Sequence, residues 1–319
     1  MDTILSVKNL KKYFPVKDGT LHAVDDITLD IQRGTTLGVV GESGCGKSTL
    51  GRVIIHLLEP TDGQIIFEGK DVTHPGKEQL KELRKDMQMI FQDPFSSIDP
   101  RMSVSQLIGE PLKIYKMCQS KEEYNKRVKE IMDTVGLASR LENTYPHELD
   151  GGRRQRIGIG RALALRPKFI ICDEPVSALD VSIQAQVLNL MQDLQEQMGL
   201  TYIFITHDLS VVRHISTEIM VMYLGMVMEK AEAKELMDRR LHPYTKALIS
   251  AIPRIDLDKK EERILLQGEL TSPINPAPCC RFAARCQYAT EKCHQCAPEL
   301  EEVMPGHYVA CHRVKEINQ

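Results

Sequence analysis

Eight residues near the N-terminus have the types and the spacing of a phosphate-binding loop. The segment Gly41-Glu42-Ser43-Gly44-Cys45-Gly46-Lys47-Ser48 fits the pattern G-x-x-x-x-G-K-[ST] and follows the apolar run Leu37-Gly38-Val39-Val40. Glycines let backbone N–H groups surround an anion, and the helix expected over Thr49–Leu58 presents its positive end to it. Residues expected to contact the nucleotide are Gly41, Ser43, Gly44, Cys45, Gly46, Lys47, Ser48 and Thr49. The sequence thus predicts a nucleoside triphosphate site with Mg²⁺ on Ser48; a glycine-rich turn joining strand to helix is the alternative.

Two adjacent carboxylates follow a second apolar run, Phe169-Ile170-Ile171-Cys172. In a parallel sheet this run ends at the edge where ligands collect. We expect Asp173 to hold the same Mg²⁺ as Ser48, and Glu174 to deprotonate the water that attacks the γ-phosphate. An acidic strand end that only faces solvent is the alternative.

Two further polar side chains follow apolar runs. His207 comes after Tyr202-Ile203-Phe204-Ile205, and Gln92 comes after Met89-Ile90-Phe91. An imidazole at a carboxyl end can reach the γ-phosphate, and an amide can reach the metal or the water. We therefore assign His207 and Gln92 to the catalytic group, and Gln92 also to the Mg²⁺ ligands with Ser48 and Asp173, although a lone histidine is more often structural.

The elements that must position these residues form an α/β fold. Alternating apolar positions before the loop predict antiparallel strands, and the all-apolar runs predict buried parallel strands. Apolar residues at helical spacing from Ile183 to Met198 predict a helix that ends near Gly199. Helix-like sequence over about 93–165 predicts an inserted helical subdomain. Turn-rich sequence from Pro253 to Pro278 separates a large domain, 1–250, from an extension, 251–319.

Composition limits the possible functions. The 319 residues carry a formal net charge of -3, and 27% of them are charged, so nothing favours nucleic acid as a partner. No apolar stretch approaches the roughly 18 residues that cross a bilayer, and the N-terminus does not resemble a secretory signal. We therefore expect a chain that works in the cytosol and can dock on a membrane protein.

Six of the nine cysteines lie in the C-terminal extension. Cys280, Cys286, Cys293 and Cys311 are separated by five, six and seventeen residues. In a reducing compartment, clustered cysteines indicate a metal more often than disulfides. Four thiolates suit zinc or an iron–sulfur cluster, and residue chemistry alone does not choose between them. Cys279 and Cys296 are possible substitute ligands, and buried free cysteines are the alternative.

The ordered motifs together resemble the ATPases of ABC transporters over residues 1 to about 250. Four of these motifs are the phosphate loop, Gln92, the apolar run followed by Asp173-Glu174, and His207. The chain also has Gly151-Gly152 and Ser177-Ala178-Leu179-Asp180. The resemblance implies a P-loop NTPase fold in which two such domains sandwich two ATP molecules. It also implies that Asp150, Gly151, Gly152 and Arg153 contact nucleotide bound to the partner. Tyr13 matches the aromatic residue that stacks on adenine, with a core tyrosine as the alternative.

Further motifs resemble the oligopeptide and dipeptide importer branch of these ATPases. They are Phe91–Arg101, Tyr145–Leu149 and His242-Pro243-Tyr244-Thr245. The resemblance implies a second homologous ATPase subunit, two transmembrane permease subunits and an extracytoplasmic peptide-binding protein as partners. It places the chain on the cytoplasmic face of the membrane. It also implies a [4Fe-4S] cluster on the four spaced cysteines. A nickel or oligosaccharide importer, and a soluble ABC protein acting on DNA or ribosomes, are the alternatives.

One motif departs from the family pattern. The usual signature reads Ser-Gly-Gly-Gln, whereas this chain has Asp150 and Arg153 at its ends. Asp150 can still cap the helix, but in a closed dimer its carboxylate would face a phosphate, and two such charges about 4 Å apart repel by roughly 4 kcal/mol at an effective dielectric of 20. Arg153 lies on the same helical face and can offset this charge. The departure predicts a heterodimer with one impaired site, or a variant signature that works normally.

Overall fold

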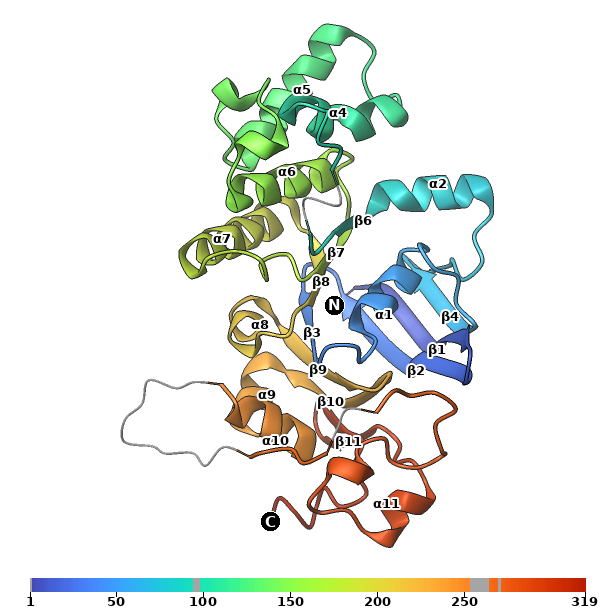
Figure 1. Cartoon of the computed structure of the whole chain (residues 1–319). Helices are drawn as coiled ribbons and strands as arrows, with labels where there is room; N and C mark the ends of the chain where they lie inside the picture. The colour runs from blue at the N-terminus through green and yellow to red at the C-terminus, as the bar shows by residue number, and fades with distance from the viewer. Residues whose placement is uncertain (1, 94–97, 253–263, 269–270) are drawn as a thin grey trace. The chain divides into compact units, whose positions relative to one another are not determined.

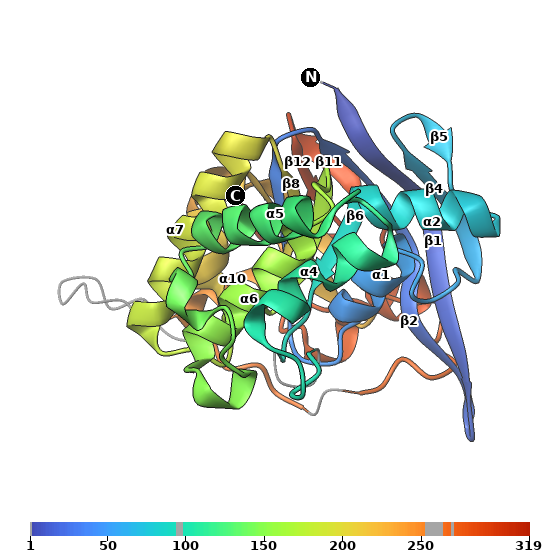
Figure 2. The same ribbon diagram turned by 90° about the horizontal axis from the view of Figure 1, so that it is seen from above.

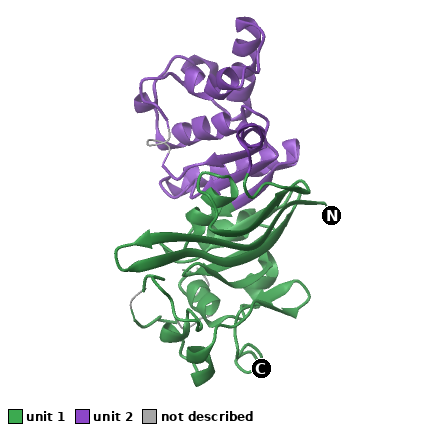
Figure 3. Ribbon diagram, turned by 90° about the vertical axis from the view of Figure 1, so that its right-hand side faces the viewer, with its two compact units in different colours: residues 1–74, 204–319 green, residues 75–203 purple. Residues whose placement is uncertain are grey.

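The computed structural model describes residues 2–93, 98–252, 264–268 and 271–319. Contacts within the chain divide it into two compact units (Figure 3). Unit 1 contains residues 1–74 and 204–319, and unit 2 contains residues 75–203. The mixture of strands and helices confirms the predicted α/β class.

Unit 1 opens with an antiparallel sheet in the order β2-β1-β4-β5 (Figure 2). Its strands are β1 (Thr3–Val16), β2 (Gly19–Gln32), β4 (Asp62–Phe67) and β5 (Lys70–Asp71). Buried Ile27, Leu29 and Ile31 of β2 explain the apolar alternation, because alternate side chains of a strand share one face. The prediction of antiparallel strands ahead of the phosphate loop is confirmed.

A second sheet of unit 1 contains the strands in the order β11-β12-β10-β9-β3. They are β3 (Thr36–Val40), β9 (Glu218–Tyr223), β10 (Met226–Glu232), β11 (Glu301–Met304) and β12 (His307–Val309). The β3–β9 pair is parallel and the other pairs are antiparallel. Every residue of β3 is buried, so the phosphate loop that follows it starts from a fixed strand end.

Four α-helices of unit 1 accompany these sheets in the part of the chain described. They are α1 (Lys47–Ile54), α8 (Leu209–Ile215), α9 (Ala233–Asp238) and α10 (Pro243–Ser250), with a fifth short one, α11 (Glu291–Gln295), in the extension. α9 and α10 pack against β10 (Figure 1). Leu236 and Tyr244 are buried in one apolar core with Phe282 of the extension. The extension therefore shares the core of unit 1.

The helix after the phosphate loop differs from its predicted bounds. We expected it over Thr49–Leu58, but α1 begins at Lys47 and ends at Ile54. Gly46 serves as the N-cap, which brings the lysine and serine into the first turn. The backbone of His56 is left-handed, with φ 56°, and this stops the helix early.

The cysteine-rich extension is built mainly from loops. Besides α11, β11 and β12 it has a 3₁₀ turn, η3 (Ala283–Arg285), and an isolated bridge between Leu21 and Ile274. β12 pairs with β10, so the last strands complete the second sheet. The predicted boundary between residues 250 and 251 lies inside unit 1. Residues 253–263, just after it, lie outside the described residues. The boundary therefore stays a prediction.

Unit 2 contains a parallel strand pair and five α-helices in its described residues, of which the three between residues 104 and 163 lie within the range of about 93–165 predicted for a helical subdomain. β6 (Met87–Ile90) pairs with β7 (Phe169–Asp173), and β8 (Thr201–Ile205) contains the boundary between the units. The helices are α2 (Lys77–Asp86), α4 (Val104–Ile114), α5 (Lys121–Thr134), α6 (Gly151–Leu163) and α7 (Val181–Met198), with 3₁₀ turns η1 (Ser139–Leu141) and η2 (Pro146–Glu148). α7 ends at Met198 and is capped by Gly199, whose φ is 65°, as the predicted end near Gly199 requires. Within the described residues, no helix is both long and apolar enough to span a bilayer.

Candidate nucleotide site

The phosphate loop leaves the end of β3 and leads into α1. Lys47 Nζ donates to the carbonyl oxygens of Gly41, at 2.8 Å, and Glu42, at 3.0 Å. The lysine is 5% exposed, so its ammonium group lies inside the loop. A buried cation held by carbonyl groups can exchange these partners for phosphate oxygens, which bind it more strongly because they are charged.

Two glycines allow the loop to pass close to neighbouring backbone. The φ of Gly46 is +103°, and a Cβ there would lie 2.0 Å from the carbonyl oxygen of Ala23. The φ of Gly41 is +151°, and a Cβ there would lie 2.1 Å from the carbonyl oxygen of Met222. Backbone oxygens cannot move aside as the end of a flexible side chain can, so both positions need glycine.

We expect Gly46→Ala to weaken nucleotide binding by at least about 100-fold, because the loop must move away from Ala23 and its N–H groups no longer surround the phosphates. Gly34→Ala is the matched control, since Gly34 has φ +75° with no heavy atom within 4 Å of the added Cβ. Calorimetric titration with Mg-ADP measures both variants. Equal affinities for Gly46→Ala and the unchanged chain would contradict this account of the loop.

Tyr13 lies in β1 and makes contacts that the sequence did not indicate. Its ring stacks on His22 with centroids 3.9 Å apart, and its hydroxyl donates to Asp25 Oδ1 at 2.5 Å. Burial and the neighbouring Asp25 raise the pKa of the Tyr13 hydroxyl well above its usual value. The tyrosine is neutral and fixed in place. Adenine stacking on this ring stays a prediction.

His207 follows β8 at the strand end nearest the loop. The backbone N–H of Thr206 donates to the carbonyl oxygen of Val39 at 3.2 Å, and Val39 lies two residues before Gly41, the first residue of the loop. The imidazole is exposed. The backbone of unit 1 therefore places His207 at the same sheet edge as the phosphate loop.

Unit 2 brings two of the predicted catalytic residues into contact. Gln92 Nε2 donates to Glu174 Oε2 at 2.9 Å. Asp173 ends β7 and is 1% exposed, whereas Glu174 next to it has φ 48°, an uncommon backbone conformation for a residue with a side chain. The left-handed backbone at Glu174 directly follows the end of β7 at the buried Asp173. The motif Phe91–Arg101 is described only in part, since residues 94–97 lie outside the described residues.

The variant signature also lies in unit 2. Asp150 is the N-cap of α6, where its Oδ1 accepts from the backbone N–H of Arg153 at 2.8 Å. Arg153 Nε lies 3.5 Å from Asp150 Oδ2, and both side chains are about half exposed. A Cβ on Gly152 would lie 2.5 Å from Ile183 Cγ2. Capping by Asp150 and its pairing with Arg153 therefore occur as expected from the sequence.

The four spaced cysteines line one small, largely enclosed cavity in the extension. Cys280, Cys286, Cys293 and Cys311 all border it, together with Phe282, while Cys279 and Cys296 do not. Burial raises the pKa of the Cys280 thiol to about 12, and the pKa values of Cys286 and Cys311 are raised for the same reason. In the described part of the chain, all nine cysteines are free of disulfides, and no three His, Cys, Asp or Glu side chains form a group that could hold a metal ion.

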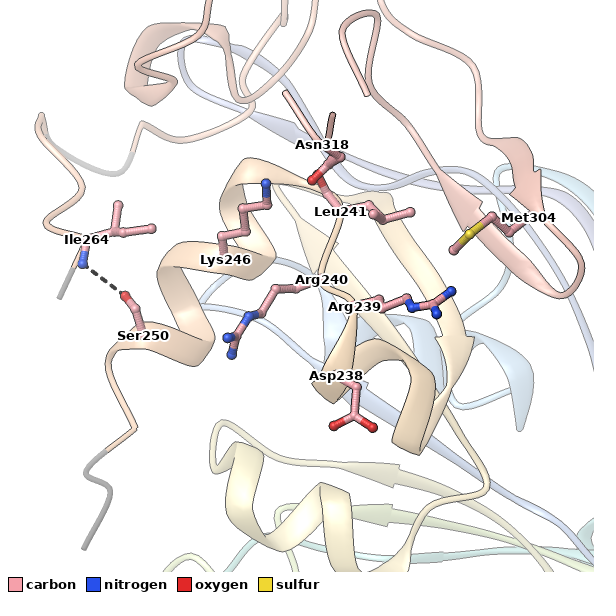
Figure 4. A pocket seen from close by; sticks show the side chains of 9 residues that line it. All are labelled: Asp238, Arg239, Arg240, Leu241, Lys246, Ser250, Ile264, Met304 and Asn318. Atoms are coloured by element: carbon pink, nitrogen blue, oxygen red, sulfur yellow. Dashed lines mark hydrogen bonds between the residues drawn. The ribbon is translucent and has the colours of Figure 1, made fainter. Parts of the chain in front are cut away.

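A second pocket of unit 1 is basic and lies apart from the phosphate loop. Arg239, Arg240 and Lys246 line it, near the end of α9 and on α10, and Ile264 N–H donates to Ser250 Oγ at 3.0 Å at its border (Figure 4). None of its lining residues is one that we assign to the nucleotide. This pocket is therefore separate from the candidate site.

Sequence reasoning missed the residues that hold Glu42, the second residue of the loop. The backbone N–H of Glu42 donates to the Tyr244 hydroxyl at 2.9 Å, and the Glu42 carboxylate pairs with Arg285 of the extension. Tyr244 was noted only as part of a family motif. No local pattern links positions so far apart along the chain.

Comparison with known proteins agrees with this set of motifs. The ABC transporter family matches residues 24–177, and the C-terminal region of oligopeptide/dipeptide transporters matches residues 228–293. A dimeric ATP-binding cassette, MJ0796, in a post-hydrolysis state with ADP and Pi has a TM-score of 0.66 and 29% identity, and covers 72% of this chain and 99% of that one. These matches define the class: an ABC ATPase with the P-loop NTPase fold.

Full-length relatives define the branch. The oligopeptide transport ATP-binding protein AppF of Bacillus subtilis is 52% identical over 98% of this chain and 97% of its own length. The proteins OppF of Salmonella typhimurium and Escherichia coli are 52% and 51% identical, each over 98% of this chain and 96% of their own length. The chain belongs to the family of oligopeptide transport ATP-binding proteins.

Proposed function

We propose that this chain is the ATP-hydrolysing motor subunit of an importer for oligopeptides or dipeptides. The observation that carries the proposal is the identity of about half the residues with oligopeptide transport ATP-binding proteins along nearly the whole chain, including its C-terminal region. The phosphate loop, with Lys47 buried inside it, supports nucleotide binding. The chain then works on the cytoplasmic face of the membrane.

In this function each candidate residue has a chemical task. Lys47 exchanges its carbonyl partners for the β- and γ-phosphate oxygens of ATP. Glu174 accepts a proton from the attacking water, and the Gln92 amide, 2.9 Å from the Glu174 carboxylate, fixes the direction of that carboxylate. His207 donates a hydrogen bond to the γ-phosphate. Tyr13 provides a ring face for adenine.

Ser48 and Asp173 are the residues that would hold Mg²⁺. A hydroxyl and a carboxylate are oxygen ligands of the kind that this hard cation prefers, and Mg²⁺ keeps several waters beside them. Bound Mg²⁺ would neutralise charge on the transferred phosphate. Asp173 is 1% exposed and ends a fully buried strand, so its carboxylate is held in one place.

The partners follow from the same family. Two such ATPase subunits close on two ATP molecules, and the signature of each, here Asp150 to Arg153, faces nucleotide on the other. We propose a different, homologous ATPase as the partner, two transmembrane permease subunits as the pore, and an extracytoplasmic peptide-binding protein as the source of cargo. Nucleic acid has no part in this function.

The signature supports an asymmetric pair of sites. The Asp150 carboxylate is half exposed and only partly offset by Arg153 at 3.5 Å, so it would oppose a phosphate that approaches it. The site that this chain's signature completes is then impaired. The site that contains its Lys47 and Glu174 hydrolyses ATP.

We expect Asp150→Ser to raise the ATPase rate of the assembled transporter by up to about twofold, because removing the repulsion lets the second site close. The serine keeps the helix cap. In the same assay, Glu174→Gln should lower the rate far more than the equivalent change in the partner subunit. Equal losses from the two glutamine variants, or a homodimer as the working form, would contradict the asymmetry.

We also propose that the four cysteines hold a [4Fe-4S] cluster. Supporting this, all four thiols border one cavity, and burial raises the pKa of Cys280, Cys286 and Cys311, so a positively charged centre is needed to make these three thiolates. The cluster would tie together an extension made mainly of loops.

Stimulation of ATP hydrolysis tests the class of cargo. The transporter is reconstituted in vesicles with the permease subunits, the partner ATPase and the binding protein, and its ATPase rate is measured with peptides, nickel or oligosaccharides. Peptides of a few residues should stimulate hydrolysis. Stimulation by nickel or by oligosaccharides, and not by peptides, would replace the proposed cargo.

A further inference from the structure

One short segment of the extension contacts both the cysteine cavity and the nucleotide-binding part of unit 1. We name Cys280–Cys286 the linking segment. Its two cysteines border the cavity, and Phe282 between them is 1% exposed in the core of unit 1. The Phe282 ring packs against Tyr223 and Tyr244, with centroids 5.4 Å apart in both pairs. The backbone of the segment is therefore anchored on two sides.

Arg285 of the linking segment holds the side chain of Glu42 in the phosphate loop. Arg285 Nη1 lies 2.6 Å from Glu42 Oε2, and Arg285 Nη2 lies 3.1 Å from Glu42 Oε1. The Arg285 side chain is only 10% exposed, against 27% for Glu42, and it also approaches the Tyr223 hydroxyl at 3.5 Å. A two-point pair of this kind fixes direction as well as charge.

Arg281 makes the equivalent contact with the strands around Tyr13. Its Nη2 lies 2.5 Å from Asp25 Oδ2, and its Nη1 donates to the carbonyl oxygen of Leu224 at 3.0 Å. The other oxygen of Asp25 accepts from the Tyr13 hydroxyl. One arginine of the segment thus contacts the second residue of the phosphate loop, and the other is linked through Asp25 to Tyr13, the predicted adenine contact.

The position of Glu42 explains why a cation is needed there. A carboxylate within a loop that binds phosphate repels the ligand unless it is neutralised or turned away. The Glu42 backbone is fixed by Tyr244, so its side chain leaves the loop from a fixed point. Of the described residues, Arg285 is the one whose guanidinium pairs with this carboxylate at two points.

We infer that Arg285 is a positioning residue for nucleotide binding. It neutralises Glu42 and holds the phosphate loop open to the anion. The cysteine-rich extension, which contains Arg285, is therefore part of the nucleotide site. The inference rests on the proposed function. It means that the extension, besides its own ligand, sets the affinity for ATP. Arg281 extends the same coupling to Tyr13 through Asp25.

A double-mutant cycle on the full chain tests this inference. Mg-ADP affinity is measured by calorimetry for Arg285→Gln, Glu42→Gln and the double variant, and the thermal midpoint of each is measured without nucleotide. Arg285→Gln should raise Kd about tenfold, which is about 1.4 kcal/mol. Glu42→Gln alone should change Kd less than twofold. The double variant should bind within about threefold of the unchanged chain, because it has no carboxylate to neutralise.

Two controls separate the possible outcomes. Arg33→Gln removes another arginine from an ion pair of unit 1, that with Glu68 at 2.9 Å, and should leave Kd unchanged. Lys47→Ala should abolish binding; if it does not, the proposed function fails. If Lys47→Ala behaves as expected but Arg285→Gln binds like the unchanged chain, or the double variant stays as weak as Arg285→Gln, only this inference is overturned.

Discussion

Replacing Glu174 with glutamine lowers the rate of ATP hydrolysis by about 100- to 10,000-fold, the range that a lost general base produces. Glutamine keeps the shape of the side chain and can still meet Gln92, but it cannot accept the proton of the attacking water. Nucleotide binding stays unchanged, because the substitution keeps Lys47, the phosphate loop and the proposed Mg²⁺ ligands Ser48 and Asp173. Phosphate release by the assembled transporter and nucleotide affinity are both measured.

A matched variant makes the result specific. Glu196→Gln removes an exposed carboxylate from α7 of the same unit and should change the rate less than twofold. Rate losses of similar size in both variants would indicate an effect of charge or folding. A Glu174→Gln protein that hydrolyses ATP at the original rate would remove Glu174 from the catalytic role.

Replacing Cys293 with serine abolishes the iron–sulfur absorbance that we expect at about 400 nm in protein purified without oxygen. Cys293 is 8% exposed and borders the cavity with three other thiols, so no solvent ligand easily takes its place. The extension also loses stability, because a loop-rich segment depends on its metal to fold. Iron and sulfide content, absorbance and the thermal midpoint measure the effect.

The control for this variant is another free cysteine. Cys118→Ser changes a partly exposed thiol of unit 2 and should leave absorbance and iron content unchanged. Colourless protein that contains zinc before any substitution would contradict the cluster. In that case zinc on the same four thiols becomes the better explanation.

Local pattern was enough to predict the parts of the site that lie within one segment. The phosphate loop, the buried run that ends in Asp173 and the cap at Asp150 each depend on neighbours a few residues away. The strand ends could also be placed, because carboxyl ends of parallel strands meet at one edge. The contact between Gln92 and Glu174 follows from the pairing of β6 with β7.

Contacts between distant segments could not be predicted. Arg285 and Glu42 lie 243 residues apart in the sequence, and neither stands in a motif that names the other. The stacking of His22 on Tyr13 across the β1–β2 pair also has no local signal in the sequence. The early end of α1 depends on the backbone at His56 and not on the apolar pattern, which continues beyond it.

Peptide uptake into vesicles tests the central claim most directly. The complete transporter is reconstituted in vesicles with either the unchanged chain or Lys47→Ala. ATP is supplied on the side of the membrane that this chain faces, which is the vesicle interior, and labelled peptide is supplied outside. We predict uptake that requires ATP and falls to background with Lys47→Ala. Uptake that continues at the original rate with Lys47→Ala would contradict the account.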